Sequence, residues 1–269
     1  MTGTTTRQSR IGATFARLRE VGETGVFPYV TVGHPELDTA QLVVPALVAG
    51  GAAMVELGIP FSDPLADGAT IQASSHAALE NGVTVAYCLQ TARDLRHEGV
   101  DVPLIFMGYY NPLLSYGLER FAADCADAGV DGIIVPDLPP DESGELLEAC
   151  RRHGRDLIFM VAPTNTDEHL AAVGRQASGF IYCVSLTGVT GARSALSAGL
   201  DEFIARVKRH TDLPLVIGFG ISAPEHVARA GALAEGVAVG SALVGLLGDT
   251  PRERQPEEVR GFIARLRGA

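Results

Sequence analysis

The chain has 269 residues, of which 46% are hydrophobic and 20% are charged, and its formal net charge is −11. Such a length can bury a large core, and it suits one α/β barrel of about 250 residues. The 32 acidic residues against 21 basic ones argue against nucleic acid and against an anionic membrane surface as partners.

The first segment, "MTGTTTRQSR", is polar. It lacks the apolar stretch of a secretory signal, so we expect a cytoplasmic protein. Beyond it, the uncharged stretch 40–55 approaches the length of a membrane span. Because Pro45 and the pair Gly50–Gly51 interrupt that stretch, a helix followed by a buried strand is the better interpretation, and we expect no membrane association.

Short apolar runs rich in Val and Ile recur along the chain and predict strands. In order they are "VFPYVTVG" (26–33), "AAMVELG" (52–58), "VPLIFMGY" (102–109), "GIIVPD" (132–137), "LIFMVAP" (157–163), "GFIYCVS" (179–185), "LPLVIGFG" (213–220) and "GVAVGS" (236–241). Continuous rather than alternating apolarity is typical of parallel strands that helices cover on both faces.

The longer amphipathic segments between these runs predict helices. They are "LDTAQLVVPALVAGG" (37–51), "VTVAYCLQTARDLRHEG" (83–99), "GLERFAADCADAG" (117–129), "DESGELLEACRRHG" (141–154), "TDEHLAAVGRQAS" (166–178), "LDEFIARVKRH" (200–210), "APEHVARAG" (223–231) and the closing "QPEEVRGFIARLRGA" (255–269). About eight strand–helix units predict a single (β/α)8 TIM barrel domain over residues 1–269, with an extra N-terminal helix. An open doubly wound sheet is the alternative.

Two acids stand out in the stretch "VELGIPFSDPLADG", residues 55–68. Glu56 lies in a predicted strand and Asp67 in the loop after it, so both would project at the carboxyl-end rim, where barrels carry their chemistry. Burial would raise the pKa of Glu56 and suit it to proton transfer, whereas a more solvated Asp67 would stay ionised. The structural alternative is that Glu56 caps a backbone amide and Asp67 forms an Asp-Gly turn.

Three late loops carry glycines after the sixth, seventh and eighth predicted strands. They are "TGVTG" (187–191), "GFG" (218–220) and "GS" (240–241). Loops after the last strands of a barrel, together with a helix N-terminus, form a common phosphate site whose donors are backbone amides. The sequence therefore predicts bound phosphate there, and the alternative is that these glycines only turn strands into helices.

Several kinds of chemistry lack the residues they need. The only lysine, Lys208, lies in a helix with a solvent-facing pattern, which argues against a Schiff base. Of the seven histidines only His34 falls at the carboxyl end of a strand, which argues against a metal centre. The cysteines Cys88, Cys125, Cys150 and Cys183 form no CxxC pair, so buried reduced thiols are expected. Any carbon–carbon cleavage must then use acid–base catalysis and an electron sink inside the substrate.

The stretch 55–68 resembles the signature of the tryptophan synthase α subunit without a departure. The likeness extends to "PYVTVGHP" (28–35), "ATIQ" (69–72), "MGYYNPLLSYG" (107–117), "VPDLPPDES" (135–143), "SLTGVTGAR" (185–193), "GFGIS" (218–222) and "VGSALV" (239–244). The resemblance implies a carbon–carbon lyase of tryptophan biosynthesis, which splits indole-3-glycerol phosphate into indole and D-glyceraldehyde 3-phosphate by a retro-aldol reaction without metal or Schiff base. Protonation of the indole ring at C3 would supply the electron sink.

The same resemblance implies roles for individual residues. Glu56 would pass protons between the glycerol hydroxyl and C3, and Asp67 would bind the indole N–H. The apolar slot for the ring would be lined by Tyr29, Ile71, Met107, Ile134, Met160, Tyr182 and Phe219. Phosphate contacts would fall on Gly191, Gly220, Gly240 and Ser241, and Thr190 would meet Asp67 when two loops close. Met107, Ile134 and Met160 have barrel core as their alternative. Tyr29 stands where relatives often carry Phe, and His34 replaces a frequent Asp.

Partners are also implied by the resemblance. This chain would hold no cofactor, and it would deliver indole to a β subunit that carries pyridoxal phosphate, in an α2β2 heterotetramer. The loop 61–67 and the segment after Ser185 would form the docking surface, with Asp63 as a candidate ion-pair partner. The alternatives are a free-standing indole-releasing lyase, a non-catalytic regulatory partner of β, and a different phosphate-binding barrel such as a sugar-phosphate isomerase or epimerase.

Overall fold

The computed structural model describes residues 9–184, 199–218 and 220–268. Its strands are β1 (Gly25–Thr31), β2 (Val55–Gly58), β3 (Leu104–Met107), β4 (Gly132–Ile134), β5 (Asp156–Val161), β6 (Ile181–Val184), β7 (Leu215–Gly218) and β8 (Gly236–Val239). Each strand pairs in parallel with the next and β8 pairs with β1, which closes the barrel. The predicted barrel is confirmed, and the open doubly wound sheet is wrong because the described strands leave no sheet edge. That one domain extends over all of residues 1–269 stays a prediction.

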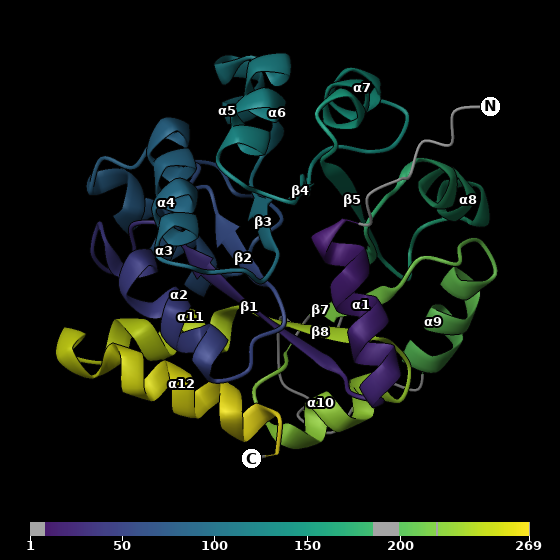
Figure 1. Ribbon diagram of the computed structural model, residues 1–269. Helices are drawn as coiled ribbons and strands as arrows, with labels where there is room; N and C mark the ends of the chain where they lie inside the picture. The colour runs from purple at the N-terminus through teal and green to yellow at the C-terminus, as the bar shows by residue number, and fades with distance from the viewer. Residues whose placement is uncertain (1–8, 185–198, 219, 269) are drawn as a thin grey trace, which may run out of the picture.

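Helices surround these strands in Figure 1. They are α1 (Arg10–Val21), α2 (Thr39–Ala49), α3 (Ala69–Glu80), α4 (Val85–His97), α5 (Tyr110–Tyr116), α6 (Leu118–Asp127), α7 (Gly144–Arg152), α8 (Asp167–Gln176), α9 (Leu200–Lys208), α10 (Pro224–Gly231), α11 (Ser241–Asp249), the 3-10 helix η1 (Arg252–Arg254) and α12 (Gln255–Leu266). The sequence patterns do not predict α3, because Ser74, Ser75 and Ala78 form most of its buried face and such small side chains weaken the helical periodicity.

The predicted N-terminal helix is α1, and it closes one end of the barrel. The Ser9 hydroxyl starts this helix by accepting a hydrogen bond from the Gly12 amide at 3.1 Å. The ring of Phe15 packs edge-on against Phe27 and Phe180, with 5.8 Å between centroids in both pairs. Because α1 and these aromatic rings fill the amino-terminal end of the barrel, a ligand could bind only at the carboxyl-terminal end.

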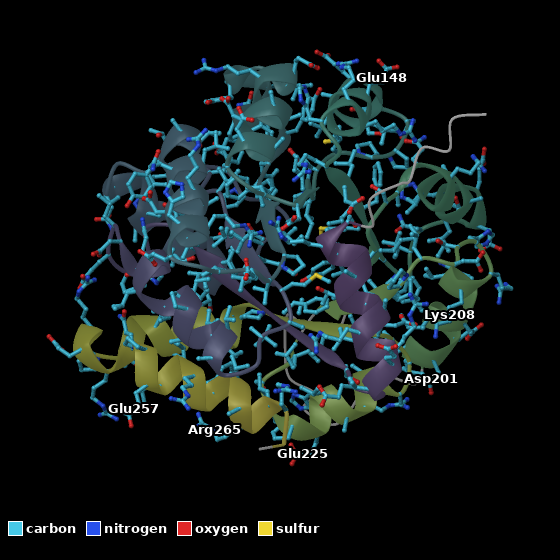
Figure 2. All side chains as sticks on the ribbon, viewed as in Figure 1. Glu148, Asp201, Lys208, Glu225, Glu257 and Arg265 are labelled. Atoms are coloured by element: carbon cyan, nitrogen blue, oxygen red, sulfur yellow. The ribbon has the colours of Figure 1, made fainter. Side chains whose placement is uncertain are left out.

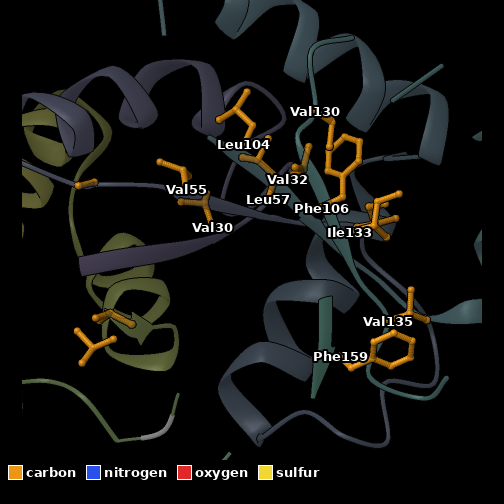
Figure 3. Close-up of a cluster of buried hydrophobic side chains, with 14 of the residues drawn as sticks. Val30, Val32, Val55, Leu57, Leu104, Phe106, Val130, Ile133, Val135 and Phe159 are labelled. Atoms are coloured by element: carbon orange, nitrogen blue, oxygen red, sulfur yellow. The ribbon is translucent and has the colours of Figure 1, made fainter. Parts of the chain in front are cut away.

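Side chains that point out of the barrel pack under the surrounding helices. Figure 3 shows part of this layer, including Val30, Leu57 and Phe106, all of which are fully buried. Burial of one such side chain stabilises the fold by about 1.5–3 kcal/mol. The layer explains why the predicted strands read as continuous apolar runs: one set of side chains fills the barrel and the other set meets the helices.

Asp131, directly before β4, is the centre of a cluster of ion pairs. Asp131 is 6% exposed, and its two carboxylate oxygens accept from Arg10 Nη1 at 2.9 Å and from Arg96 Nη2 at 2.6 Å. The backbone amide of Leu104 donates to the same carboxylate at 3.0 Å. Arg96 also donates to the carbonyls of Gly129 and Val102. The cluster therefore ties α1 and α4 to the amino ends of β3 and β4.

Charged side chains are spread over the outer helices (Figure 2), and Lys208 and Asp201 lie on α9 among them. Lys208 is exposed, as predicted. All four cysteines are buried and free. None of the helices in the described ranges combines the length and apolarity needed to cross a bilayer.

Candidate active site

A cavity of about 890 Å³ lies at the carboxyl ends of the strands. The predicted site residues that line it are Tyr29, Glu56, Asp67, Ile71, Met107, Met160, Tyr182, Gly220, Gly240 and Ser241. Ile134 is not among the lining residues, because it is fully buried in the core inside the barrel. Thr190, Gly191, Phe219 and the segment 185–198 lie outside the described residues.

Glu56 is the buried acid of the cavity. It lies on β2 between Tyr29 of β1 and Ile105 of β3 in register, and only 1% of it is exposed. Its Oε1 atom has no hydrogen-bond partner among the described residues. Burial removes water from the carboxylate and raises the pKa of Glu56 to about 8. Near neutral pH the side chain is therefore mostly protonated, so it can give a proton to a bound molecule.

The buried carboxyl makes a testable contribution to stability. The pKa of Glu56 rises from 4.5 to about 8 on folding. The contribution of Glu56 to the free energy of unfolding therefore becomes less favourable as the pH rises from 4.5 towards 8, and it stays constant above that. The free energy of unfolding of Glu56→Gln minus that of wild type should therefore be larger at about pH 8.5 than at about pH 5, by about 2–4 kcal/mol. Urea unfolding at the two pH values measures this; the same difference between variant and wild type at both values would contradict it.

Asp67 is the second acid, and it is half-buried in the loop between β2 and α3. Burial raises its pKa to about 6, although the neighbouring Tyr109 hydroxyl acts in the opposite direction. Two hydrogen bonds fix the backbone of Asp67. Its amide donates to the Pro64 carbonyl at 3.0 Å, and its carbonyl accepts from the Gln72 side chain, Nε2, at 2.9 Å. Near neutral pH Asp67 is mostly ionised while Glu56 is mostly neutral, so the two acids differ in charge.

Ser75 anchors the loop that carries Asp67. Its hydroxyl accepts from the Phe61 amide at 2.8 Å and donates to the Phe61 carbonyl at 3.0 Å. Ser75 is 4% exposed and belongs to α3. A small hydroxyl on this helix therefore fixes the start of the loop, which explains why a polar side chain is buried there.

Tyr109 is a site residue that the sequence patterns do not single out. It follows β3, is 5% exposed, and its hydroxyl oxygen accepts from the Ala66 amide at 3.0 Å. Because the oxygen already accepts a hydrogen bond, the hydroxyl proton is free to act on the adjacent Asp67. The signal that could have found it is its position as the last residue of the apolar run 102–109, at the carboxyl end of a predicted strand.

The rings of two tyrosines approach glycines of the neighbouring strands closely. A Cβ atom at Gly58 would come 2.0 Å from the Tyr29 hydroxyl oxygen, and one at Gly218 would come 2.3 Å from that of Tyr182. No real side chain fits at such distances. Gly58 and Gly218 therefore make room for two phenol rings on the wall of the cavity that contains Glu56.

The predicted phosphate end of the cavity is formed by a helix N-terminus. Gly240 precedes α11 and Ser241 begins it, without a side chain capping the first amides. The first amides of a helix have no partner within it, and they favour an anion. Gly220 adopts a φ of +67°, a backbone conformation that favours glycine whether or not phosphate is bound. The conformation therefore fits both the phosphate prediction and the alternative that this glycine only forms a turn.

The cavity extends beyond the predicted residues along the loop after β4 and towards α8. Pro136, Asp137, Asn165 and His169 line this part. Among the residues that the structure describes, no group of three or more His, Cys, Asp or Glu side chains is placed to hold a metal ion. His34 lies half-buried after β1, and burial lowers its pKa.

Proteins of a known family are similar to this chain in sequence. The sequence profile of the family described as "Tryptophan synthase alpha chain" matches residues 15–265. A protein of that name from Roseiflexus sp. (strain RS-1) is 55% identical over 97% of this chain and 100% of its own length. One from Chloroflexus aggregans is 54% identical over 96% of both chains.

Solved structures agree in fold. The crystal structure of tryptophan synthase subunit alpha from Legionella pneumophila str. Paris superimposes with a TM-score of 0.88 at 32% identity, covering 97% of each chain. A structure of Mycobacterium tuberculosis tryptophan synthase matches with a TM-score of 0.88 at 37% identity, over 97% of this chain and 98% of that one. With a profile match along most of its length and relatives that share more than half of its residues, this chain belongs to the tryptophan synthase alpha chain family.

Proposed function

We propose that this chain is a carbon–carbon lyase that cleaves indole-3-glycerol phosphate into indole and D-glyceraldehyde 3-phosphate. The observation that carries the proposal is Glu56, a buried carboxyl without a partner for its Oε1 among the described residues, with a pKa raised to about 8 by burial. It shares one cavity with the ionised Asp67 and with the N-terminus of α11. A neutral acid, an anion and an anion-binding helix end are what this substrate needs.

The first step that these residues support is proton transfer to the ring. Neutral Glu56 gives its proton to C3 of the indole, and the ring nitrogen takes up the positive charge as an iminium. The Asp67 carboxylate accepts a hydrogen bond from the N–H group and stabilises that charge. Protonated C3 is then a leaving group, so no metal or lysine is needed as an electron sink.

The second step breaks the carbon–carbon bond. Glu56, now a carboxylate, takes the proton of the hydroxyl on the carbon attached to C3, and a carbonyl forms at that carbon. The bonding electrons return to the ring, which restores C2=C3 and neutral indole. Glu56 ends protonated, as it began, so one residue completes the cycle.

Substrate binding uses the rest of the cavity. The ring would lie among Tyr29, Ile71, Met107, Met160 and Tyr182, and the phosphate on Gly220, Gly240 and Ser241. The direct assay is spectrophotometric indole release from indole-3-glycerol phosphate. A protein that binds this compound without releasing indole would point to the non-catalytic alternative.

The two acids predict a bell-shaped pH dependence of kcat/KM. Activity should rise as Asp67 ionises, with a midpoint near its pKa of about 6, and should fall as Glu56 loses its proton, near its pKa of about 8. Both values belong to the free enzyme, which is what kcat/KM reports. Indole release followed from about pH 5 to pH 9.5 measures the two limbs. A rate that keeps rising through about pH 8.5 would show that Glu56 does not start as the acid.

The proposal includes a β subunit that carries pyridoxal phosphate and receives the indole, in an α2β2 assembly in the cytoplasm. The loop 61–67 is the proposed contact surface, and its Leu65 is 92% exposed. Asp63 is exposed beside it, with Ser62 donating to its carboxylate at 2.5 Å. Indole release measured with and without β separates the alternatives, since a free-standing lyase would not respond to β.

A further inference from the structure

Asp67 ends a tight turn, residues 64–67, directly before α3. The Asp67 amide donates to the Pro64 carbonyl at 3.0 Å and closes the turn. Helix α3 begins two residues later, at Ala69. The place from which the Asp67 carboxylate enters the cavity therefore depends on how this turn is held against the helix that follows it.

Gln72 is the side chain that joins the two ends of the turn to α3. Its Nε2 group donates to the Asp67 carbonyl at 2.9 Å and, over a longer distance of 3.5 Å, to the Pro64 carbonyl. An amide NH2 group carries two protons, so Nε2 can bind both carbonyls at once. Because Pro64 and Asp67 are the residues that the turn brings together, these two contacts fasten the whole turn to the first turns of α3.

The other side chains that hold this loop bind it elsewhere. Ser75 binds the backbone at the start of the loop, and the Tyr109 hydroxyl accepts from the Ala66 amide at 3.0 Å. Among the described side chains, Gln72 is the one that donates to the carbonyl of Asp67 itself. Without Gln72 the loop would keep its other anchors, but the residue that carries the carboxylate would be less firmly held.

Gln72 acts at a distance from the cavity. Asp67, Gly68 and Ile71 belong to the described residues that line the cavity, whereas Gln72 does not line it and is exposed. Its side chain can therefore affect a bound molecule only through Asp67. Because the position is exposed, substitution of Gln72 leaves the packing of the core intact, and the variants are expected to fold.

We propose that Gln72 is a positioning residue for Asp67: by donating to the Asp67 and Pro64 carbonyls, it fixes the backbone from which the Asp67 carboxylate reaches into the cavity. A carboxylate stabilises the charge that develops on a ring only if it is already in place, and a displacement of about 1 Å is enough to lower turnover. The effect on turnover rests on the proposed function, but the hold on the turn does not.

The first test measures the order of the turn and needs no substrate. Gln72→Met keeps the length of the side chain but removes its donors. Amide hydrogen exchange of residues 61–68, followed by mass spectrometry from milliseconds upwards, should become about 3–10-fold faster, the change expected when one hydrogen bond is lost. Gln90→Met is the matched control, because Gln90 donates to Asp94 at 2.7 Å on the exposed face of α4 and should leave exchange of 61–68 unchanged. Wild-type exchange of 61–68 in Gln72→Met would overturn the proposal.

Turnover provides the second test. In Gln72→Met, kcat for indole release should fall by about 3–10-fold, and KM should change by less than about twofold, because a transition-state interaction is weakened and no contact with substrate is removed. Gln72→Glu keeps the shape but offers an acceptor, so it should lose as much. Gln72→Lys offers a donor again and should recover most of the loss.

The outcomes separate this role from a merely structural one and from the proposed function. Equal losses of kcat in Gln72→Met, Gln72→Glu and Gln72→Lys would show that donation to the carbonyls is not what matters, and would refute the inference. A loss that falls on KM alone would also refute it. If wild type releases no indole, the proposed function fails, while the exchange measurement still decides whether Gln72 holds the turn.

Discussion

Glu56→Gln is expected to lower kcat for indole release by at least about 100-fold, within the range of about 10²–10⁴-fold typical of a general acid–base group. Gln has nearly the same shape and can neither give the C3 proton nor take the hydroxyl proton. Both steps of the cycle depend on the same carboxyl, so the substitution should block both of them. Steady-state assays at saturating substrate, near pH 7, measure the loss.

Binding should survive the same substitution. The variant should still bind a substrate analogue in which the hydroxyl on the reacting carbon is replaced by hydrogen, because Tyr29, Gly240 and Ser241 are unchanged. Calorimetric titration with this analogue separates chemistry from binding. Glu80→Gln, on the exposed face of α3, is the matched control and should keep wild-type turnover. If Glu56→Gln keeps more than about a tenth of the wild-type rate, Glu56 does not perform the proton transfers.

The largest loss of stability is expected from Asp131→Ala. Removing this carboxylate leaves the guanidinium of Arg96, which is 12% exposed, without its counter-charge, and it removes the acceptor of the Leu104 amide. Loss of one partner of a buried ion pair typically destabilises a protein by about 3–5 kcal/mol. Urea or guanidinium unfolding followed by circular dichroism measures the change.

An exposed ion pair provides the comparison. Arg229 donates to both oxygens of Asp201 at 2.8 Å, but the two side chains are 43% and 53% exposed. Asp201→Ala should therefore change the unfolding free energy by about 1 kcal/mol or less. Equal losses in the two variants would show that burial of the Asp131 cluster adds nothing, contrary to the structure.

Much of the site could be predicted because its signals are local. An acid inside the apolar run 52–58 indicates a buried carboxyl wherever that strand lies, and the pKa of Glu56 is indeed raised by burial. Gly240 and Ser241 come at the end of an apolar run, so a helix N-terminus at this position, which is that of α11, could be predicted from the sequence pattern. These inferences needed only the neighbours along the chain.

Other features depend on residues that are far apart in the chain. Asp67 is more solvated than Glu56, as predicted, but its partial burial and a pKa raised to about 6 are not visible in the sequence, because they arise where the loop packs against Tyr109 and is anchored by Ser75. Ile134 lies fully buried in the core inside the barrel and does not line the cavity, so its place in the ring slot stays a prediction. Neither outcome is visible in the local sequence.

The eight strands, most of the helices and the two acids could be predicted from the amino-acid order, because hydrophobic periodicity and an acid in an apolar run are properties of neighbouring residues. Three arrangements could be seen only in the folded chain: Tyr29 lies over Gly58, Tyr109 accepts from the Ala66 amide, and Asp131 binds two arginines from different helices. Those arrangements come from closing the barrel, which brings side chains from separate strands and helices within a few ångströms. Burial and charge at such contacts, and hence the protonation of the acids, exist only after the chain has folded.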